Sequence, residues 1–336
     1  MLFQKCKMKH ANISLFVPHA GCPHQCSFCN QKTISGSVKQ LTPEDVAKTL
    51  KQAVEDNVNP ENTEIAFFGG SFTAIEREYM IALLEETVPY VKNGSFYGLI
   101  VSTRPDAIDE EVLSVLKKYG VTSIELGAQS TDDSVLLLNR RGHTRDDIIK
   151  ASKLIKQMGF SLGLQMMTGL LGDTDEGALY TAQMIASLMP DTVRIYPTIV
   201  LKNTYLEKAF LDGTYKPQSV EDAANLSAKL LRFFESKGIN VIRVGLHSID
   251  NDAFVAGPWH AAFGEIVKSK IYLKEILNAL KDKPKGNYVV FVNPSEISKA
   301  TGQKKDNITK LAEFGYVCKI KGDNNTDIYS VKIKEE

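Results

Sequence analysis

Short apolar segments alternate with longer amphipathic segments over the first two thirds of the chain. Apolar runs predict buried strands at 13–17, 64–70, 96–102, 122–129, 161–169 and 192–197. Amphipathic segments predict a helix that follows Thr42 as its N-cap, and further helices over about 76–91, 109–119, 144–158 and 175–188. A strand followed by a helix, repeated along the chain, is typical of a parallel sheet with helices outside it.

Six strand–helix units are fewer than the eight of a closed TIM barrel. The sequence therefore predicts an α/β fold with a partial (β/α)6 TIM-like barrel. In such folds, functional residues gather where the strands end. Polar and glycine residues follow the predicted strands at this edge, and they are Gly69, Gly70, Ser102, Arg104, Gln129, Gly169 and Tyr196. Each has an ordinary explanation as a turn or a strand exit, so their common position is what makes them candidates.

The alternation weakens after about residue 215. We predict the barrel over 1–215 and a barrel-completing extension over 216–280, with a helix near 220–237 and a strand at 242–246. The segment KDKPKGN (281–287) is typical of a linker. Residues 286–336 then predict a small αβ module with two strands near its end.

Part of this module resembles the helix–loop–helix of a KH RNA-binding domain. The KH loop is G-x-x-G and holds the nucleotide backbone; here it reads Gly302-Gln303-Lys304-Lys305, with a lysine in place of the second glycine. Residues 281–336 contain 11 Lys, no Arg and 8 Asp or Glu, a mildly basic balance that is compatible with RNA binding. A small capping module with no RNA partner is the alternative interpretation.

The amino-acid composition indicates more about where the protein works than about what it does. The 336 residues carry 40 Lys and Arg and 40 Asp and Glu, so the global charge indicates neither nucleic acid nor a membrane surface. We expect no transmembrane helix, because no run of 18 apolar residues occurs, and no secretory signal. Cysteines expected to be reduced favour the cytoplasm.

Three of the five cysteines lie in one short segment, GCPHQCSFCNQ, as Cys22, Cys26 and Cys29 with the spacing C-x3-C-x2-C. Three thiolates can hold three irons of a cubane iron–sulfur cluster and leave the fourth iron open, whereas clusters that only carry electrons normally have four Cys ligands. A zinc site completed by His19 or His24 is an alternative. A disulfide framework is disfavoured, because the count is odd and the chain is long enough to bury a core.

The chain resembles the radical S-adenosylmethionine (SAM) enzymes. The cysteine spacing after a first barrel strand resembles the hallmark of that family, and GGSFT (69–73) resembles its glycine pair. STRPDAID (102–109), the segment 124–144, MMTGLLGDT (166–174) and AGPWHAAFGEIVKS (256–269) are similar to the catalytic subunit of the Elongator complex. Similarity to oxygen-independent coproporphyrinogen oxidase is weaker. The chain is closest to Elongator-like proteins lacking the acetyltransferase domain, since no acetyl-CoA motif follows the barrel.

The resemblance implies roles for individual residues. Cys22, Cys26 and Cys29 would bind a [4Fe–4S] cluster, and Gly69 and Gly70 would let backbone approach the methionine end of SAM. Further cofactor-binding residues would be Phe28 near adenine, Ser102 at the ribose hydroxyls, Gln129 at the ribose or carboxylate, Arg141 at the carboxylate, and Gln165, which would orient substrate or cofactor. Arg140 is an alternative to Arg141, a loop anchor is an alternative for Phe28, and a turn or cap role is preferred for His143.

Two departures from the family pattern leave the substrate open. Leu171 stands where a proline is usual, and Gln165 stands where relatives often have His or Asp. The resemblance implies an enzyme that cleaves SAM to a 5′-deoxyadenosyl radical, with RNA (tRNA) as its substrate and a flavodoxin or ferredoxin as its electron donor. The alternatives are a radical SAM enzyme acting on a small molecule or a tetrapyrrole, and a zinc-stabilised RNA-binding protein.

Overall fold

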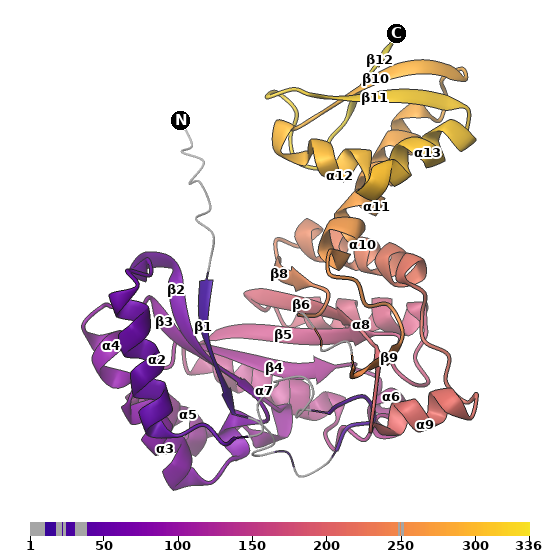
Figure 1. Ribbon diagram of the computed structural model, residues 1–336. Coiled ribbons are helices and arrows are strands. Elements are labelled where there is room, and N and C mark those ends of the chain that lie inside the picture. Colours follow the sequence, from indigo (N-terminus) through magenta and orange to yellow (C-terminus); the bar gives the residue numbers. More distant parts are fainter. Residues whose placement is uncertain (1–10, 18–21, 23–24, 31–38, 248, 250–251) are drawn as a thin grey trace.

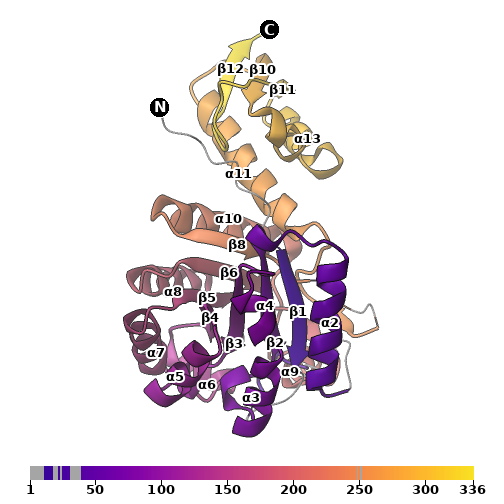
Figure 2. The same cartoon turned by 90° about the vertical axis from the view of Figure 1, so that its left-hand side faces the viewer.

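The structure is a computed structural model that describes residues 11–17, 22, 25–30, 39–247, 249 and 252–336. Within these residues the largest element is a parallel, seven-stranded sheet that curls into an open barrel (Figures 1 and 2). Its strands, in their order across the sheet, are β1 (Ala11–Val17), β2 (Thr63–Gly69), β3 (Gly98–Thr103), β4 (Ser123–Gln129), β5 (Ser161–Thr168), β6 (Thr192–Pro197) and β8 (Asn240–Val244). The predicted partial barrel is confirmed, and the strand expected at 242–246 joins it as β8.

Helices cover the convex side of the sheet. They are α2 (Pro43–Glu55), α3 (Arg77–Glu85), α4 (Val88–Lys92), α5 (Glu110–Lys118), α6 (Asp133–Leu138), α7 (Arg145–Gln157), α8 (Asp175–Ser187) and α10 (Val220–Ser236). Helix α9 (Tyr205–Leu211) packs apart from them, in a small cluster with Val200 and Phe28. Thr42 caps α2 as expected, with a reciprocal capping box to Asp45. Among the described helices, none is both long and apolar enough to span a bilayer.

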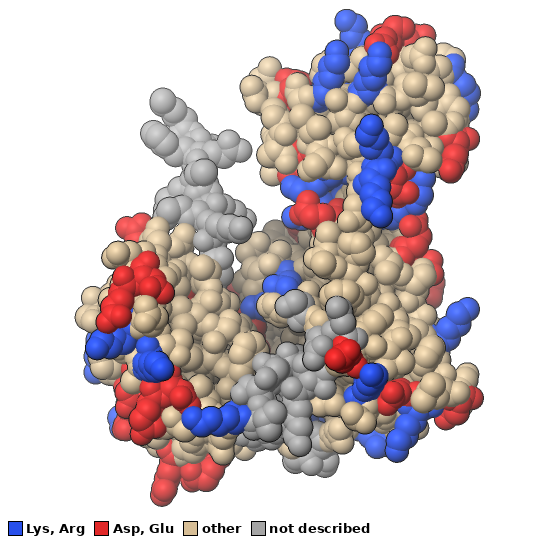
Figure 3. All heavy atoms as spheres, in the orientation of Figure 1, with Lys and Arg blue, Asp and Glu red and all other residues tan. Residues whose placement is uncertain are grey.

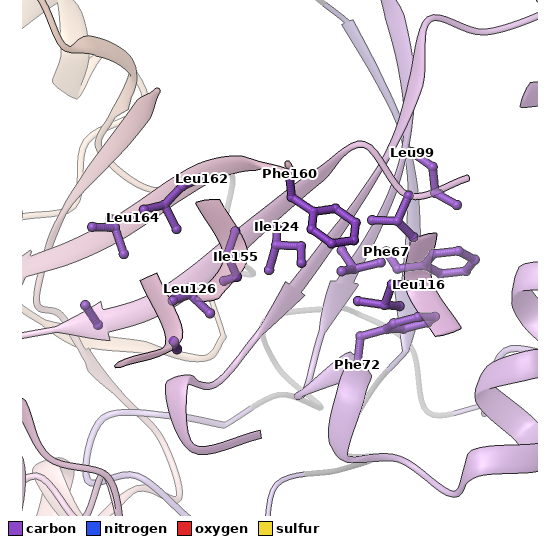
Figure 4. Close-up of a cluster of buried hydrophobic side chains, with 14 of the residues drawn as sticks. Phe67, Phe72, Leu99, Leu116, Ile124, Leu126, Ile155, Phe160, Leu162 and Leu164 are labelled. Atoms are coloured by element: carbon purple, nitrogen blue, oxygen red, sulfur yellow. The ribbon is translucent and has the colours of Figure 1, made fainter. Parts of the chain in front are cut away.

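The main core lies between the sheet and these helices (Figure 4). Side chains from alternate strand positions, such as Ile124 and Leu126 on β4, pack against helix residues such as Ile155 on α7. Phe67 of β2 stacks on Phe72, which follows the strand, with ring centroids 4.5 Å apart. Burial of one side of every strand leaves the other side free to line the inside of the curled sheet.

The sequence prediction was wrong in detail at one helix. The segment predicted as one helix over 76–91 forms α3 and α4, because Val88 and Pro89 start a new helix and a proline cannot continue the preceding one. Helix α6 was not predicted. It lies between β4 and α7 and is too short to show a clear period.

The C-terminal residues build a second sheet with its own core. Its elements are α11 (Phe263–Leu280), β10 (Gly286–Val292), α12 (Ile297–Thr301), α13 (Asp306–Glu313), β11 (Tyr316–Gly322) and β12 (Lys332–Glu335). Among the described strands, β10 lies centrally, parallel to β11 and antiparallel to β12. Gly286 and Asn287 belong to β10, so the connection is shorter than the linker predicted over 281–287.

Helix α11 connects the barrel to this module (Figure 1). Its first half packs on α10 through Phe263, Val267 and Ile271, and its second half enters the module core through Ile276 and Leu280. The domain boundaries 1–215, 216–280 and 286–336 stay a prediction.

Candidate active site

The cysteine segment follows β1 at the edge where the barrel strands end. Its backbone is tied to the rest of the rim, because Ser27 N–H donates to Asn139 O at 3.1 Å and Leu206 N–H donates to Ser27 O at 2.8 Å. The Ser27 hydroxyl donates to Asn139 Oδ1 at 2.7 Å, and both side chains are fully buried. Asn139 in turn donates to Val135 O and Leu171 O at 2.8 and 2.9 Å. The Cys loop is thus held by the end of α6.

Phe28 lies between the second and third cysteines and packs against two small apolar clusters. One includes Leu206 and Tyr215, and the other includes Met167 and Leu170. This packing favours the alternative role of Phe28 as a hydrophobic anchor for the loop. A contact with adenine stays a prediction.

The three thiols influence one another and lie near two buried guanidinium groups. Burial, together with Cys26 and Cys22, raises the pKa of Cys29 to about 12, against a smaller lowering effect of Arg141. Burial and Cys26 raise the pKa of Cys22, opposed by Arg104, Arg141 and a backbone hydrogen bond from Ser71. A metal centre that binds these sulfurs must therefore displace their protons.

The residues present fit an iron–sulfur cluster better than a single ion. In the described part of the chain, no three His, Cys, Asp or Glu side chains converge closely enough to hold one metal ion. In a cubane each thiolate binds a different iron, so the sulfurs need not converge on a point. Arg104 Nη1 and Arg141 Nε are buried donors with no partner among the described residues, and they would favour an anionic group beside the cysteines. His19 and His24 lie outside the described residues.

Arg141, not Arg140, points inward. Arg141 is buried and donates from Nη1 to Cys26 Sγ at 3.1 Å and from Nη2 to Gly127 O at 2.7 Å. Arg140 has a left-handed backbone (φ 54°), is exposed, and places its guanidinium 4.0 Å from the centroid of the Tyr205 ring. The role of Arg141 at a SAM carboxylate stays a prediction, and its observed partner is a predicted cluster ligand.

The predicted glycine pair lies at the end of β2, directly beside β1. Gly69 has φ 119°, and a Cβ there would lie 2.6 Å from Val17 O, so only glycine fits. Gly70 N–H donates to that same carbonyl at 3.0 Å. The pair therefore lets the two strands approach where the Cys loop begins. Its contact with SAM stays a prediction.

Gln129, at the end of β4, and Gln165, within β5, are brought together on neighbouring strands. Gln165 Nε2 donates to Gln129 Oε1 at 3.1 Å. Gln129 is buried and has φ 64°, at a bulge in the pairing of β4 with β5. A buried, non-glycine residue in the left-handed region is costly and often marks a functional site. The two predicted cofactor residues thus act as one unit.

The inner side of the sheet carries an ion pair that the sequence analysis missed. Arg194 on β6 forms a bidentate contact with Glu125 on β4, with Nη2 and Oε1 2.8 Å apart, and both are nearly buried. Ser102, a predicted site residue, donates weakly to Glu125 Oε2 at 3.4 Å. The available signal was a charged residue in the middle of each apolar run, IELGAQ and TVRIYP.

Next to this pair, Arg243 on β8 is the register partner of Arg194 on the neighbouring strand β6. It donates to the carbonyls of Gly245 and Leu246 at 3.1 and 3.2 Å, and in the described part of the chain it has no carboxylate partner. Tyr196 OH lies 3.4 Å from Arg194 Nη1. Figure 3 shows a hollow in this region with Lys or Arg atoms on its wall. The interior is thus polar and cationic on the side of β6 and β8.

A separate pocket of about 310 Å3 lies beyond the end of β5, between the 169–175 and 214–218 segments. Burial raises the pKa of its Asp173 to about 6. None of the predicted cofactor residues lines this pocket, so the cysteine rim and the inner side of the sheet, not this pocket, form the candidate active site.

His143 is a buried structural residue beneath this rim. It directly precedes Thr144, the N-cap of α7, and its Nε2 lies 3.3 Å from Ala128 O. Burial and Arg141 lower its pKa to about 4. This agrees with the preferred position before a helix cap.

Comparison with known proteins agrees with this geometry. The sequence profile of the Radical SAM superfamily matches residues 16–185, just over half of the chain, and that of the Radical_SAM C-terminal domain matches residues 190–273. A tRNA uridine(34) acetyltransferase of Dehalococcoides mccartyi is 26% identical over 232 residues, which are 58% of this chain and 50% of that protein. Elongator complex protein 3 of Dictyostelium discoideum is 30% identical over 193 residues, 52% of this chain and 34% of that protein.

A solved structure of archaeal Elp3 from Methanocaldococcus infernus has the same fold, with a TM-score of 0.65 and 24% identity over 79% of this chain and 63% of that one. The chain spans about half the length of the tRNA uridine(34) acetyltransferases that it matches. A zinc-stabilised, non-enzymatic protein is excluded by the family match. The chain belongs to the radical SAM superfamily, whose enzymes use a [4Fe–4S] cluster and SAM, and it is similar to Elongator-type proteins.

Proposed function

We propose that this enzyme modifies RNA, with tRNA as the substrate class. The observation that carries the proposal is the similarity to curated relatives named for tRNA uridine(34), which extends over 232 to 253 residues of the alignments. A cationic interior supports it, because Arg194 and Arg243 could receive a nucleotide phosphate beside the cysteine rim. We expect the enzyme to work in the cytoplasm, with a flavodoxin or ferredoxin as electron donor.

In this proposal the residues of the rim have distinct tasks. Cys22, Cys26 and Cys29 hold the cluster as thiolates, and Arg141 positions Cys26 and the carboxylate of SAM. When bound, the cluster and SAM supply a 5′-deoxyadenosyl radical. Gln129 and Gln165 orient the nucleoside part of SAM, and Glu125 fixes Arg194 so that its guanidinium is held in place before substrate enters.

Nucleoside profiling tests the proposal. We expect deletion of the gene to remove at least one modified nucleoside from bulk tRNA, as measured by mass spectrometry. The wild-type gene restores it and a C26A gene does not, because the loop loses one cluster ligand. C318A is the matched control, since Cys318 is a buried cysteine of the C-terminal module. An RNA profile unchanged by deletion would overturn the proposal.

A small-molecule or tetrapyrrole substrate is the second candidate. The observation that favours it is the Glu125–Arg194 pair, because a buried, polar wall can select a compact substrate as well as a nucleotide. In that case deletion leaves the tRNA profile unchanged, while the purified, reconstituted enzyme still releases 5′-deoxyadenosine from SAM.

A further inference from the structure

The outer side of the C-terminal sheet combines lysines with an aromatic side chain. Strand pairing places Phe291 between Lys321 of β11 and Lys332 of β12, and Val289 between Lys319 and Lys334. The alternate positions, among them Tyr288, Val290, Cys318 and Ile333, point into the module core on the helix side. The six residues of the first set point away from the helices, and we call them the lysine face: Val289, Phe291, Lys319, Lys321, Lys332 and Lys334.

The lysine face is open to solvent. All four lysines are exposed, and Phe291 is half-buried between their stems. Figure 1 shows α11, α12 and α13 together on one side of this sheet, the side toward which the alternate positions point. Figure 3 shows several Lys or Arg side chains at the end of the molecule where Figure 1 places β10, β11 and β12.

The charge of the face is only half compensated. Lys319 pairs with Glu336 at 2.6 Å and Lys332 pairs with Asp323 at 2.7 Å. Lys321 and Lys334 have no acidic partner in the described part of the chain, and they lie at opposite corners of the face. Outward residues of one strand are about 7 Å apart and neighbouring strands about 5 Å apart, so the four ammonium groups surround one aromatic ring at short range.

We propose that the lysine face binds a single-stranded stretch of RNA, with a base stacked on Phe291 and the phosphates along the flanking lysines. Single-stranded nucleic acids are bound by this combination of a basic surface and a stacking ring, because every base has a π face and every linkage carries a charge. The inference deepens the proposed function and rests on its premise that the substrate is RNA.

The chemistry of the face favours RNA over a membrane or an acidic protein. A membrane surface site usually presents several protruding apolar side chains beside its lysines. On the lysine face Val289 is buried and Phe291 is half-buried, and the exposed apolar side chain in the same outward row of β11 is the short Val317. An acidic peptide would pair with the lysines but would leave the ring between them unused. A nucleotide strand uses both.

The face lies far from the cysteine rim, at the opposite end of the molecule from the end of β1 (Figure 1). It therefore holds a part of the RNA that is remote from the reacting nucleotide. Binding there raises substrate affinity without touching the chemistry, so its loss weakens RNA binding and leaves SAM cleavage unchanged.

Fluorescence anisotropy on the full-length protein tests the inference, with a fluorescein-labelled uridine oligomer of about 12 nucleotides as the probe. The test variant is K321E/K334E. The matched control is K281E/K283E, which makes the same charge change at two exposed lysines of the connection directly before the module, off the face. F291L removes the ring and keeps an apolar side chain, and circular dichroism and thermal melts check that every variant is folded.

We expect F291L to weaken binding about tenfold, because one stacked base is lost. In K321E/K334E the slope of log affinity against log salt falls by about 1.4, because two phosphate contacts are removed from a single strand. The K281E/K283E control shifts affinity slightly and keeps the slope. Release of 5′-deoxyadenosine in the absence of RNA stays the same in all three variants.

Three outcomes overturn the inference: equal losses in K321E/K334E and K281E/K283E, a larger loss in K304E/K305E of the helix–loop–helix than in K321E/K334E, or binding of phosphatidylserine vesicles in place of the oligomer. Failure of the proposed function is a separate result. If deletion leaves the tRNA profile unchanged but the wild-type protein binds the oligomer, tRNA modification is refuted and the lysine face remains an RNA-binding surface. If deletion changes the tRNA profile but K321E/K334E binds the oligomer as the wild type does, tRNA modification stands and the role of the lysine face is refuted.

Discussion

Arg140 and Arg141 are adjacent in sequence but differ in every contact. The left-handed backbone at Arg140 follows the end of α6 and turns its side chain outward, which places the next side chain beneath Cys26. No pattern in NRRGHT distinguishes the two, because the direction of each side chain depends on where α6 ends. The difference makes them a matched pair of variants.

Replacing Arg141 tests the inward arginine. We expect R141M to weaken SAM binding about tenfold to a hundredfold, because charge-assisted hydrogen bonds are lost. It should also lower the free energy of unfolding by about 1–3 kcal/mol, because Gly127 O loses its donor. R140M removes only an exposed cation–π contact. Equilibrium dialysis with anaerobically reconstituted protein measures the first effect and urea unfolding the second; equal behaviour of the two variants would contradict this assignment.

The lowered pKa of His143 leads us to expect that stability depends on pH. Its pKa falls from 6.5 to about 4 on folding, because it is buried beside Arg141 and Arg104, with the hydrogen bond to Ala128 O and the charge of Asp106 opposing them. Between these values the unfolded chain binds the proton and the folded chain does not, so stability is lost as pH falls from about 6.5 to 4, by about 3 kcal/mol in full. H143Q can still donate to Ala128 O but does not titrate. Urea titrations at pH 7 and pH 4.5 should show a smaller loss for H143Q, and parallel losses would refute the role of His143.

At the scale of elements, the Cys loop depends on α6, an element that the sequence did not reveal. Ser27 and Asn139 form a fully buried contact between the two. We expect N139A to lower the free energy of unfolding by about 2–3 kcal/mol, because the Ser27 hydroxyl and two carbonyls lose partners. It should also reduce the iron content after reconstitution. N30A, which removes only an exposed contact to Lys202 O, is the control. Full iron content in N139A would show that the loop is held in another way.

The elements show why part of the site could be predicted and part could not. The strands and most helices follow from local periodicity, and the cysteine segment and Gln129 follow or end predicted strands, whereas Gln165 lies inside a predicted strand and is implied by the family resemblance. Glu125 and Arg194 are 69 residues apart, and their pairing depends on strand curvature and register, which no local pattern contains. The same holds for Ser27 with Asn139, which are 112 residues apart. Contacts between segments that are distant along the chain complete the site, and local sequence patterns do not predict such contacts.

At the scale of the whole molecule, helix α11 joins the barrel to the C-terminal module. Lys270 of α11 is nearly buried and lies 2.8 Å from Glu221 of α10 and 3.5 Å from Asp306 of α13. Lys310 lies 2.7 Å from the same Glu221 oxygen. These lysines lower the pKa of Glu221, so the carboxylate is charged when it bridges the two parts. Helix α11 packs into both cores, and the contacts of Lys270 and Lys310 with Glu221 connect α10 to α11 and α13. We therefore expect the barrel and the module to unfold together.

The Lys270 bridge can be broken from either side, and the two results should differ. E221Q/D306N leaves the buried ammonium of Lys270 without a counter-charge, and we expect it to lower the free energy of unfolding by about 3 kcal/mol. K270M removes the buried charge and keeps the length of the side chain, so it should be nearly neutral. Urea unfolding followed by the fluorescence of Trp259, outside the module, and by far-ultraviolet circular dichroism gives one coincident transition if both parts unfold together. In E221Q/D306N the two probes should separate, because the bridge supports the coupling. Coincident transitions in that variant, or a loss in K270M as large as in E221Q/D306N, would show that apolar packing along α11 is sufficient to couple them.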